Sequence, residues 1–446
     1  MLFLNRRGTF RGGTHVPMHK ETSDMATVTM DLPAKVRIPM QQHLGAPCIP
    51  TVAKGDKVKA GQIIGSSDKY VSAPVHSGVS GTVTAVNPIM YAGGCEVMTV
   101  EIETDGLQET HESVKPHSPA DKDDFIRIIS GSGLVGLGGA GFPEHVKLKP
   151  PAGLEVDTLI VNAAECEPYI TSDFREMIEN STDIAEGVRL LLDIMGYKKA
   201  IIGIEDNKPK AIDLMKKTFS GNEKVSVESL KSIYPQGAEK MLIYSLTGRK
   251  VPQGKLPSEV GVIVMNVTTV SFIAKYLRTG MPLVGKRVTV VGNAVSKPGN
   301  VYALIGTSIS DVINACGGFS IQPMKVITGG PMMGAAQFSL ETPVTKTTND
   351  ILVFDEKEAI LPAESPCIRC GRCVDVCPIG LLPLYINLHT LRKNIDELVK
   401  FNPCDCIECG SCSYVCPAKR KLVQSIRLGK VMVRNVALKA KTTGPA

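Results

Sequence analysis

Two copies of the cysteine pattern C-x2-C-x2-C-x3-C-P lie near the carboxyl end of the chain and constrain its fold more than any other feature. The first copy reads CIRCGRCVDVCP from Cys367, and the second reads CIECGSCSYVCP from Cys406. The first ten residues contain an apolar run too short for a secretory signal, so we do not expect the thirteen cysteines to form a disulfide framework. Eight thiolates at fixed spacing indicate a bound metal centre instead.

The spacing selects the kind of metal centre. Zinc is usually held by two separated pairs of ligands around one ion. Here three thiolates follow one another at gaps of two residues, which suits three corners of a cubane iron–sulfur cluster. The fourth cysteine points toward a neighbouring cluster, and the proline after it keeps the next turn from drawing it back. A structural zinc module is the alternative that we disfavour.

The doubled pattern resembles that of two-cluster bacterial ferredoxins. The resemblance implies two 4Fe-4S clusters whose ligands cross between the copies. Cluster 1 would be held by Cys367, Cys370, Cys373 and Cys416. Cluster 2 would be held by Cys406, Cys409, Cys412 and Cys377. Such a pair carries single electrons, and the fold expected here is α-helical and ferredoxin-like.

The other residues of this region and the remaining cysteines have more ordinary interpretations. The spacing of five apolar residues between the two copies predicts one amphipathic helix that packs across the clusters. These residues are Leu384, Leu388, Leu391, Ile395 and Leu398. Four scattered cysteines are expected to be small, buried apolar side chains. They are Cys48, Cys95, Cys166 and Cys316.

Composition indicates several globular domains and no membrane span. The 446 residues exceed one ordinary core, and hydrophobic and charged residues make up 43% and 21%. No apolar run approaches the ~20 residues that cross a bilayer.

The net charge of +6 is concentrated after the last cysteine, with a basic tail at 431–446. Because aromatic residues do not accompany it, we expect no nucleic-acid binding. A solvated helix face, or docking of an acidic protein or an anionic membrane, would explain it.

A glycine-rich segment at 131–148, GSGLVGLGGAGFPEHVKL, is the first candidate for a ligand site. It contains G-x-G-x-x-G at Gly131, Gly133 and Gly136. A Rossmann fingerprint is disfavoured, because the preceding DDFIRIIS has helical spacing and Pro143 interrupts the expected helix. The glycines still allow close approach of the backbone to a flat ring or a phosphate, and Lys147 supplies positive charge.

Alternating strands and helices follow this segment. We expect strands at 157–162, 200–205 and 260–266, with helices from about 182 to Gly196, after Pro209 and near Gln236. This order predicts an open parallel sheet, whose ligands bind beyond the carboxyl ends of the strands. The segments NAAECEP (162–168), IEDN (204–207) and MNVTT (265–269) lie at those ends.

These segments resemble the flavoprotein subunit of respiratory complex I, which binds FMN with NADH stacked upon it. The resemblance implies a set of cofactor-binding residues. They are Gly136, Gly138, Gly139, Gly141, Phe142, Lys147, Asn162, Glu165, Glu167, Gly237, Glu239, Asn266 and Thr269. Two family acids are replaced by Ala164 and Ala238, which bears on how the nicotinamide is contacted. No catalytic acid or nucleophile is implied, because hydride transfer takes place on the flavin.

The outer segments resemble further known modules, and together they define an α/β multidomain chain. Residues 33 to 105 resemble the barrel-sandwich hybrid of lipoyl and biotinyl domains. Lys69 lies too close to Pro74 for a lipoyl hairpin, so an unmodified module is favoured. We also expect His15 and His19 to be structural. Residues from 286 resemble the SLBB domain, which is β-grasp-like. The expected domains are 1–115 (barrel-sandwich hybrid), 116–280 (FMN and NADH), 281–345 (SLBB), 355–430 (two clusters) and 431–446 (tail).

The order of these modules resembles, across nearly the whole chain, that of the C subunits of Rnf complexes. The resemblance implies a peripheral, NAD-reacting subunit on the cytoplasmic face of the cell membrane. It would belong to a ferredoxin:NAD+ oxidoreductase that translocates Na+ or H+, with integral membrane subunits, a ferredoxin-like subunit and ferredoxin as partners. Its expected cofactors are FMN and two 4Fe-4S clusters, with NAD(H) as substrate. A cobalamin reductase of diol-degrading microcompartments and a non-catalytic docking subunit are the alternatives.

Overall fold

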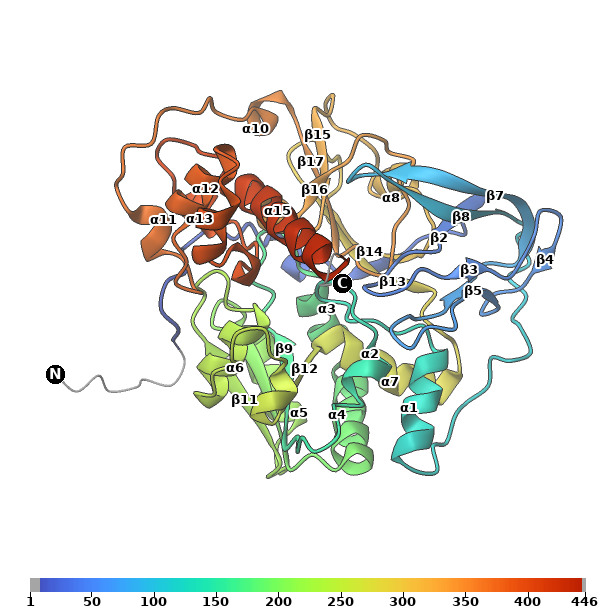
Figure 1. The fold of residues 1–446 in the computed structure, drawn as a ribbon. Helices are drawn as coiled ribbons and strands as arrows, with labels where there is room; N and C mark the ends of the chain where they lie inside the picture. Colours follow the sequence, from blue (N-terminus) through green and yellow to red (C-terminus); the bar gives the residue numbers. More distant parts are fainter. Residues whose placement is uncertain (1–8, 443–446) are drawn as a thin grey trace.

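A computed structural model describes residues 9–442, and side chains as far as 436 in the last helix. The chain forms a β-rich module, a parallel α/β domain, a second mixed sheet and a helical domain that contains the cysteine patterns (Figure 1). One hydrophobic core runs through the β-rich module and the α/β domain, from Val36 to Ile305. These two parts are therefore packed as one body.

The β-rich module consists of two small antiparallel sheets. The larger has the order β2 (Lys35–Pro39), β8 (Cys95–Thr104), β7 (Gly81–Tyr91) and β4 (Lys57–Val58). The smaller has the order β3 (Ile49–Pro50), β5 (Ile63–Ser66) and β6 (Val75–His76). The exposed Lys69 lies in the loop between β5 and β6. Cys48 is buried as expected, but the prediction for Cys95 was wrong, because the β7–β8 hairpin extends past the core and exposes it.

The α/β domain is built on the expected parallel sheet. Its strand order is β11 (Val225–Leu230), β10 (Lys199–Glu205), β9 (Thr158–Ala163) and β12 (Val262–Asn266). Its α-helices are α1 (Lys122–Gly131), α2 (Glu144–Lys147), α3 (Ser172–Glu179), α4 (Ser181–Met195), α5 (Pro209–Thr218), α6 (Glu239–Thr247) and α7 (Val267–Thr279). A 3-10 turn, η2 (Pro257–Val260), precedes β12. Helix α4 ends where predicted, because Gly196 takes the left-handed conformation (φ 74°) that closes a helix.

The strand order contains one reversal. From β9 the chain adds β10 and then β11 on one side, and β12 returns to the other side of β9. The crevice beyond the carboxyl ends of β9 and β12 is therefore the topological switch point, where open α/β sheets bind their ligands.

The second sheet is assembled from distant parts of the chain. Its order is β1 (Thr27–Thr29), β14 (Gly299–Leu304), β13 (Gly285–Val291), β17 (Asp350–Phe354), β15 (Lys325–Thr328) and β16 (Ala335–Ala336), with helices α8 (Ile309–Ala315) and α9 (Gly330–Met333). Strand β1 comes from the N-terminal segment, after the 3-10 turn η1 (Glu21–Asp24), and β17 lies beyond residue 345, where we placed the end of this domain. Two strands of the sheet were therefore absent from the expected segment.

The helical domain differs from the expected arrangement in one respect. It contains α10 (Glu356–Ala359), α11 (Arg372–Asp375), α12 (Pro383–Leu391), α13 (Ile395–Lys400), η3 (Pro403–Asp405), α14 (Ser411–Tyr414) and α15 (Leu422–Thr442). The prediction of a single helix between the cysteine patterns was wrong, because Lys393 has a positive φ (52°) that separates α12 from α13. Leu398 is buried, whereas Leu391 is exposed.

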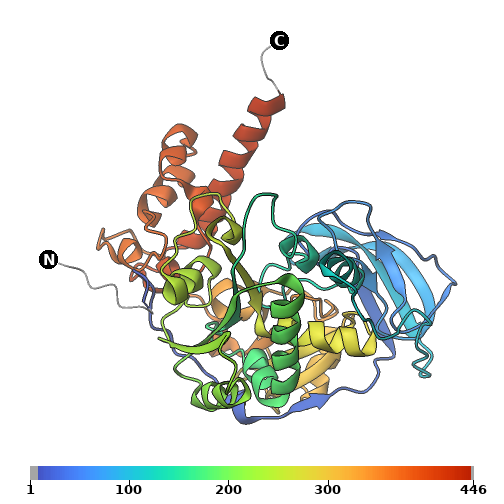
Figure 2. The ribbon, with the colours of Figure 1, turned by 90° about the horizontal axis from the view of Figure 1, so that it is seen from below.

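Helix α15 carries the basic residues that follow the second pattern, and Figure 2 shows it projecting from the body. Two of them, Arg427 and Lys430, form ion pairs with Glu408 at 2.8 and 2.6 Å. They therefore stabilise the second cysteine turn. Residues 443–446 of the expected tail lie outside the described residues, as do the side chains of Lys439 and Lys441. None of the helices in the described part of the chain combines the length and hydropathy of a bilayer span.

Candidate functional site

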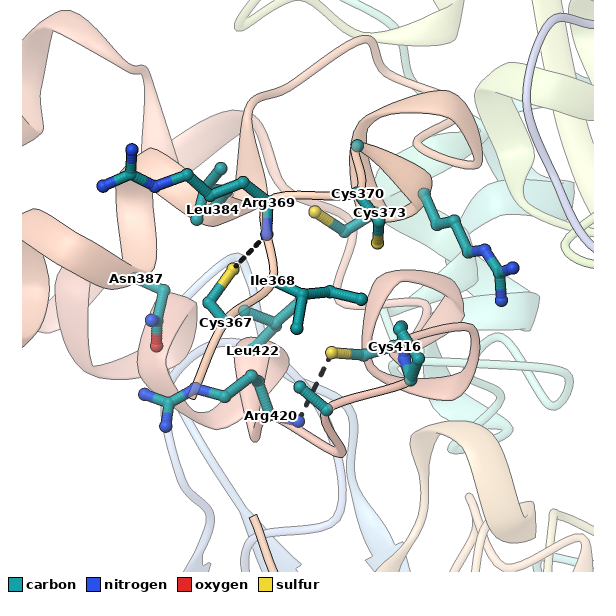
Figure 3. Close-up of a pocket in the computed structure, with 14 residues that line it drawn as sticks. Cys367, Ile368, Arg369, Cys370, Cys373, Leu384, Asn387, Cys416, Arg420 and Leu422 are labelled. Carbon is teal, nitrogen blue, oxygen red and sulfur yellow. Dashed lines mark hydrogen bonds between the residues drawn. The ribbon is translucent and has the colours of Figure 1, made fainter. Parts of the chain in front are cut away.

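The structure gathers the eight patterned cysteines into two pockets. The first is lined by Cys367, Cys370, Cys373 and Cys416 (Figure 3). The second is lined by Cys377, Cys406, Cys409 and Cys412. In each pocket three cysteines come from one copy and the fourth from the other. The structure thus groups the cysteines in the same two sets that the resemblance to two-cluster ferredoxins implied.

The two copies fold in the same way. In each, the residue two places after the first cysteine has a positive φ, 54° for Arg369 and 59° for Glu408. This conformation turns its backbone N–H toward the first thiol, at 3.4 Å from Cys367 Sγ and 3.3 Å from Cys406 Sγ. The fourth thiols also accept backbone bonds, since Leu381 N donates to Cys377 Sγ at 3.3 Å and Arg420 N to Cys416 Sγ at 3.5 Å.

The donor sets fit iron–sulfur clusters. Burial raises the pKa of the Cys406 thiol to about 11, and it raises that of Cys412 further. Four thiols around one space become thiolates together only if a cation binds between them. The N–H groups directed at sulfur would then stabilise the remaining negative charge.

The two pockets differ in their distance from solvent. Cys367 and Cys370 are exposed, whereas Cys409 and Cys412 are buried. The turn before α14 packs on helix α9, because a Cβ on Gly410 would lie 2.7 Å from the carbonyl oxygen of Met332. The second pocket is therefore the inner one, and the first is the outer one.

The glycine-rich loop lies at the switch point of the parallel sheet. Gly136 N donates to Phe142 O at 2.9 Å, which closes the loop, and Leu137 N donates to the Thr269 hydroxyl at 3.1 Å. Gly138 lies against Asn266, where a Cβ would be 2.4 Å from the side-chain nitrogen. A larger residue here would displace either the loop or the Asn266 side chain.

Two asparagines hold the loops on either side of the crevice. Asn162 donates to Gly237 O at 2.9 Å and accepts from Ala164 N at 3.2 Å. Asn266 caps α7 by accepting from Thr268 N at 2.9 Å, and its side-chain nitrogen donates to Asp173 at 2.7 Å. The structure thus brings together Gly136, Gly138, Lys147, Asn162, Gly237, Asn266 and Thr269.

Two buried polar groups with an unpartnered atom lie beside the loops that border this crevice. Glu144 is fully buried; one carboxylate oxygen binds Lys147 Nζ at 2.7 Å, and the other has no partner among the described residues. Burial raises the pKa of Glu144, against the effect of Lys147. The side-chain nitrogen of Gln236, beside Gly237, is similarly buried without an acceptor in residues 9–442. Sequence reasoning missed both residues, although Glu144 precedes Lys147 by one helical turn.

The surface of the loop is open toward this crevice. Gly138 and Gly139 are exposed, and a Cβ on Gly139 would meet nothing within 4 Å. A planar, polar ligand such as a flavin fits these surroundings, because backbone glycines offer a flat surface and the unpaired groups offer hydrogen bonds.

Glu165 and Glu167, the two acids of the segment after β9, lie on the other side of that segment. Glu165 accepts from Asp173 N at 2.7 Å, and Glu167 accepts from Met332 N at 2.7 Å. Glu165 also lines a cavity with Lys20 and Lys208. Burial raises the pKa of Glu165 to about 7. Both acids thus fix the loop to neighbouring elements.

Two lysines that sequence reasoning missed hold the carbonyl groups of the same loop. Lys20 Nζ donates to the carbonyl oxygens of Glu165 and Glu167 at 3.0 and 2.8 Å. Lys208 Nζ donates to Ala164 O at 2.7 Å. The loop is therefore clamped from the side that lies away from Gly237.

Three predicted residues lie at the margins of the crevice. The Gly141 carbonyl accepts from Leu44 N of the β-rich module at 3.1 Å, and Phe142 follows it. Glu239 is the first residue of α6 and is exposed. Of the two departures from the flavoprotein pattern, Ala164 is buried against Gly237, and Ala238 precedes α6.

Comparison with protein families supports this division of the chain. Residues 8–107 match the RnfC barrel sandwich hybrid domain, and residues 129–275 match the Nuo51 FMN-binding domain. Residues 287–336 match the SLBB domain, and residues 366–419 match the 4Fe-4S dicluster domain. The chain thus has an FMN-binding domain and a domain for two 4Fe-4S clusters, as predicted.

Solved structures show the same fold in part. The NAD+-reducing [NiFe]-hydrogenase in its air-oxidized state has a chain that aligns with a TM-score of 0.51 and 20% identity, over 74% of this chain and 69% of that one. At this identity the likeness concerns the fold alone.

Curated relatives cover almost the whole chain. The C subunit of the Na(+)-translocating ferredoxin:NAD(+) oxidoreductase complex of Acetobacterium woodii is 46% identical, over 95% of this chain and 97% of its own length. The C subunit of the proton-translocating complex of Clostridium ljungdahlii is also 46% identical, over 94% of this chain and 93% of its own. The C subunit of the ion-translocating oxidoreductase complex of Rhodobacter capsulatus is 39% identical, over 95% and 82%. The chain therefore belongs to the family of C subunits of Rnf complexes, the ion-translocating ferredoxin:NAD+ oxidoreductases.

Proposed function

We propose that this chain is the NAD-reacting subunit of a ferredoxin:NAD+ oxidoreductase complex and passes electrons between two 4Fe-4S clusters, FMN and NAD(H). The observation that carries the proposal is the position of the inner cysteine pocket. Its Gly410 turn packs on Met332, and the backbone N–H of Met332 binds Glu167 in the loop that borders the flavin crevice. An inner cluster would thus be separated from the flavin by only a few residues.

The residues of the crevice would hold FMN in the following way. Gly138 and Gly139 would offer a flat surface to the ring, with Lys147, Glu144 and Gln236 providing charge and hydrogen bonds. When bound, FMN supplies the exchange between hydride transfer, which moves two electrons, and the single-electron chemistry of the clusters. The chain itself would supply position and exclusion of water, which requires no side-chain acid or nucleophile.

The two cysteine sets suggest an order in which the clusters would be arranged along an electron path. We propose that Cys367, Cys370, Cys373 and Cys416 hold cluster 1, and that Cys377, Cys406, Cys409 and Cys412 hold cluster 2. Cluster 2 would exchange electrons with the flavin, and cluster 1 would exchange them with a partner, since Cys367 and Cys370 are exposed.

The surroundings of the outer pocket fit an acidic electron carrier. Arg369, Arg372, Lys419 and Lys421 are exposed around it, and Ile368 has 68% of its surface exposed. Positive charge around an apolar centre favours rapid association with a negatively charged protein. We propose that a ferredoxin-like subunit docks here, and that integral membrane subunits hold the chain at the cytoplasmic face of the membrane.

Anaerobic reduction tests the proposal. The purified chain, reconstituted with FMN, iron and sulfide, should lose its flavin and iron–sulfur absorbance when NADH is added. Failure of NADH to reduce either centre would contradict the proposed function. A chain that retains no flavin after gentle purification, and takes up none on reconstitution, would support the docking-subunit alternative instead.

A further inference from the structure

The N-terminal segment at residues 12–20, which we call the strap, contacts parts of the molecule outside the β-rich module to which the sequence assigned it. It forms no helix or strand of its own. In Figure 1 it is the dark blue chain that passes between the cluster domain and the parallel α/β domain. Its sequence, GGTHVPMHK, was notable for His15 and His19, but most of its contacts are made by other residues.

One end of the strap touches the inner cysteine pocket. Gly12 has a φ of +83°, and a Cβ there would lie 2.8 Å from the carbonyl oxygen of Cys377. Gly13 has a φ of +82°, and its N–H donates to Val376 O at 2.9 Å. Cys377 is the cysteine that joins the inner pocket from the first copy of the pattern. Two glycines are therefore required where the strap passes over this ligand.

The next residue joins the strap to the flavin crevice. Thr14 N donates to Tyr234 O at 2.8 Å, and Tyr234 N donates to Thr14 O at 3.0 Å. Tyr234 is buried and lies three residues before Gly237, which Asn162 binds at the crevice. A pair of backbone bonds thus fixes the strap to the segment that carries Gln236 and Gly237.

The far end of the strap holds the other loop that borders the crevice, the one that follows β9. Lys20 Nζ donates to the carbonyl oxygens of Glu165 and Glu167, and Tyr169 N donates to Met18 O at 2.8 Å. The His19 ring stacks on Tyr169, with 4.6 Å between ring centroids. One short segment therefore contacts an inner-cluster ligand and both loops that border the flavin crevice.

We propose that the strap is a positioning element that sets the distance between the inner iron–sulfur cluster and the flavin. The inference rests on the proposed function. The helical domain is joined to the second sheet by the connection 355–371, in which α10 is the only regular element, so this covalent link does not fix its position. The packing of Gly410 on Met332 holds one side of the inner pocket, and the strap supplies a further link at Cys377. Because the rate of electron transfer falls steeply with distance, a small displacement of the inner cluster from the flavin would slow the transfer.

Two pairs of variants separate the strap's role from general effects. G12A introduces a Cβ that collides with Cys377 O, whereas G106A has a similar φ (+76°) but nothing within 4 Å of its Cβ. T14P removes the N–H that binds Tyr234 O, whereas T14A keeps both backbone bonds. G106A and T14A are therefore the matched controls.

The first readout needs no turnover. Amide hydrogen exchange should be faster in G12A and T14P at residues 233–237 and 374–380 than in either control. The second readout follows anaerobic mixing of the full, reconstituted chain with NADH. Flavin bleaching should keep its wild-type rate, whereas the subsequent reduction of the clusters should be at least about tenfold slower in G12A and T14P.

Three results would overturn the proposal. The first is cluster reduction at the wild-type rate in both G12A and T14P. The second is equal slowing in G106A or T14A. The third is loss of flavin or iron from G12A and T14P, which would show that the strap retains the cofactors and does not set their separation. If NADH fails to bleach the flavin of the wild-type chain, the proposed function is wrong. The amide hydrogen exchange rates would still show whether the strap holds the two segments in position.

Discussion

Asn162 and Asn266 are in-register partners at the carboxyl ends of β9 and β12, and each side chain fixes a loop at the same crevice. Asn162 binds the Gly237 loop, and Asn266 caps α7 and touches Gly138. The switch point of the sheet is thus bordered by two amides that connect strands to ligand-binding loops.

Replacing Asn266 tests this connection. N266A removes the α7 cap and the bond to Asp173, so we expect the free energy of unfolding to fall by about 1–2 kcal/mol and the flavin affinity to decrease. N266S keeps a capping oxygen and should recover most of the stability but not the bond to Asp173. Chemical denaturation and flavin titration measure the two effects. Equal stability of N266A and the wild type would contradict the role of the cap.

Alanine substitutions of the adjacent residues Gly138 and Gly139 can be compared directly. G138A places a Cβ 2.4 Å from the Asn266 side chain, so it should destabilise the apoprotein and weaken flavin binding together. G139A adds a methyl group to open space, so the apoprotein should keep its melting temperature. Because that space is where we place the flavin, G139A should still weaken FMN binding. Unchanged FMN affinity in G139A would place the ring elsewhere.

The sequence alone was enough to predict those features whose geometry depends on the spacing of residues along the chain. The cysteine gaps predicted the two pockets, and Gly196 predicted the end of α4. The pairing of strands that are distant in the sequence could not be predicted in this way. The three residues of β1 carry no signal for pairing with β14, and nothing local marks Lys393 as the residue that divides the expected helix.

Buried charges were missed for a related reason. A lysine in a sequence is most often exposed, whereas Lys208 is buried and Lys20 is half-buried, and both are held mainly by carbonyl groups from a distant loop. Glu144 shows the same limit, because its burial depends on how the glycine-rich loop folds back over α2. The burial of such residues can be recognised only when the positions of the segments that surround them are known.

The stability of the second sheet should depend on pH through Asp350. This buried carboxylate accepts from Gly329 N and Gly330 N at 2.7 and 3.0 Å, and burial raises its pKa from 3.8 to about 7. The folded state therefore holds a proton that the unfolded state releases between these two pH values. Stability should accordingly fall as the pH rises toward 7 and should not change further above it.

D350N provides the comparison for this pH effect. Asparagine does not titrate, so the difference in unfolding free energy between the wild type and D350N should shrink as the pH rises from about 5.5 to about 7. Denaturation of both proteins across pH 5.5–8 measures this difference. A difference that stays constant over this range would mean that Asp350 is charged in the folded state.

Removal of iron should unfold the helical domain alone. Its core contains few large side chains, and five of the cysteines, including Cys373 and Cys412, pack among Leu381, Ile386 and Ile426. Without metal the buried thiols would stay protonated, and the bonds through metal that join the two copies of the pattern would be lost. Chelation should therefore expose residues beyond 355 to protease and leave the parallel α/β domain intact. Unchanged protease resistance of the helical domain would contradict this prediction.

Paired cysteine variants test whether the ligand sets cross between the two copies of the pattern. C367A/C416A removes two thiols from the outer pocket, so about half of the iron should remain, in a cluster with wild-type spectroscopic features. C367A/C377A removes one thiol from each pocket, although both residues belong to the first copy. It should therefore disturb both clusters and lose most of the iron. If each copy instead bound its own cluster, the two results would be exchanged, because C367A/C377A would then spare the second cluster entirely. Iron content and low-temperature electron paramagnetic resonance of the two double variants distinguish these arrangements.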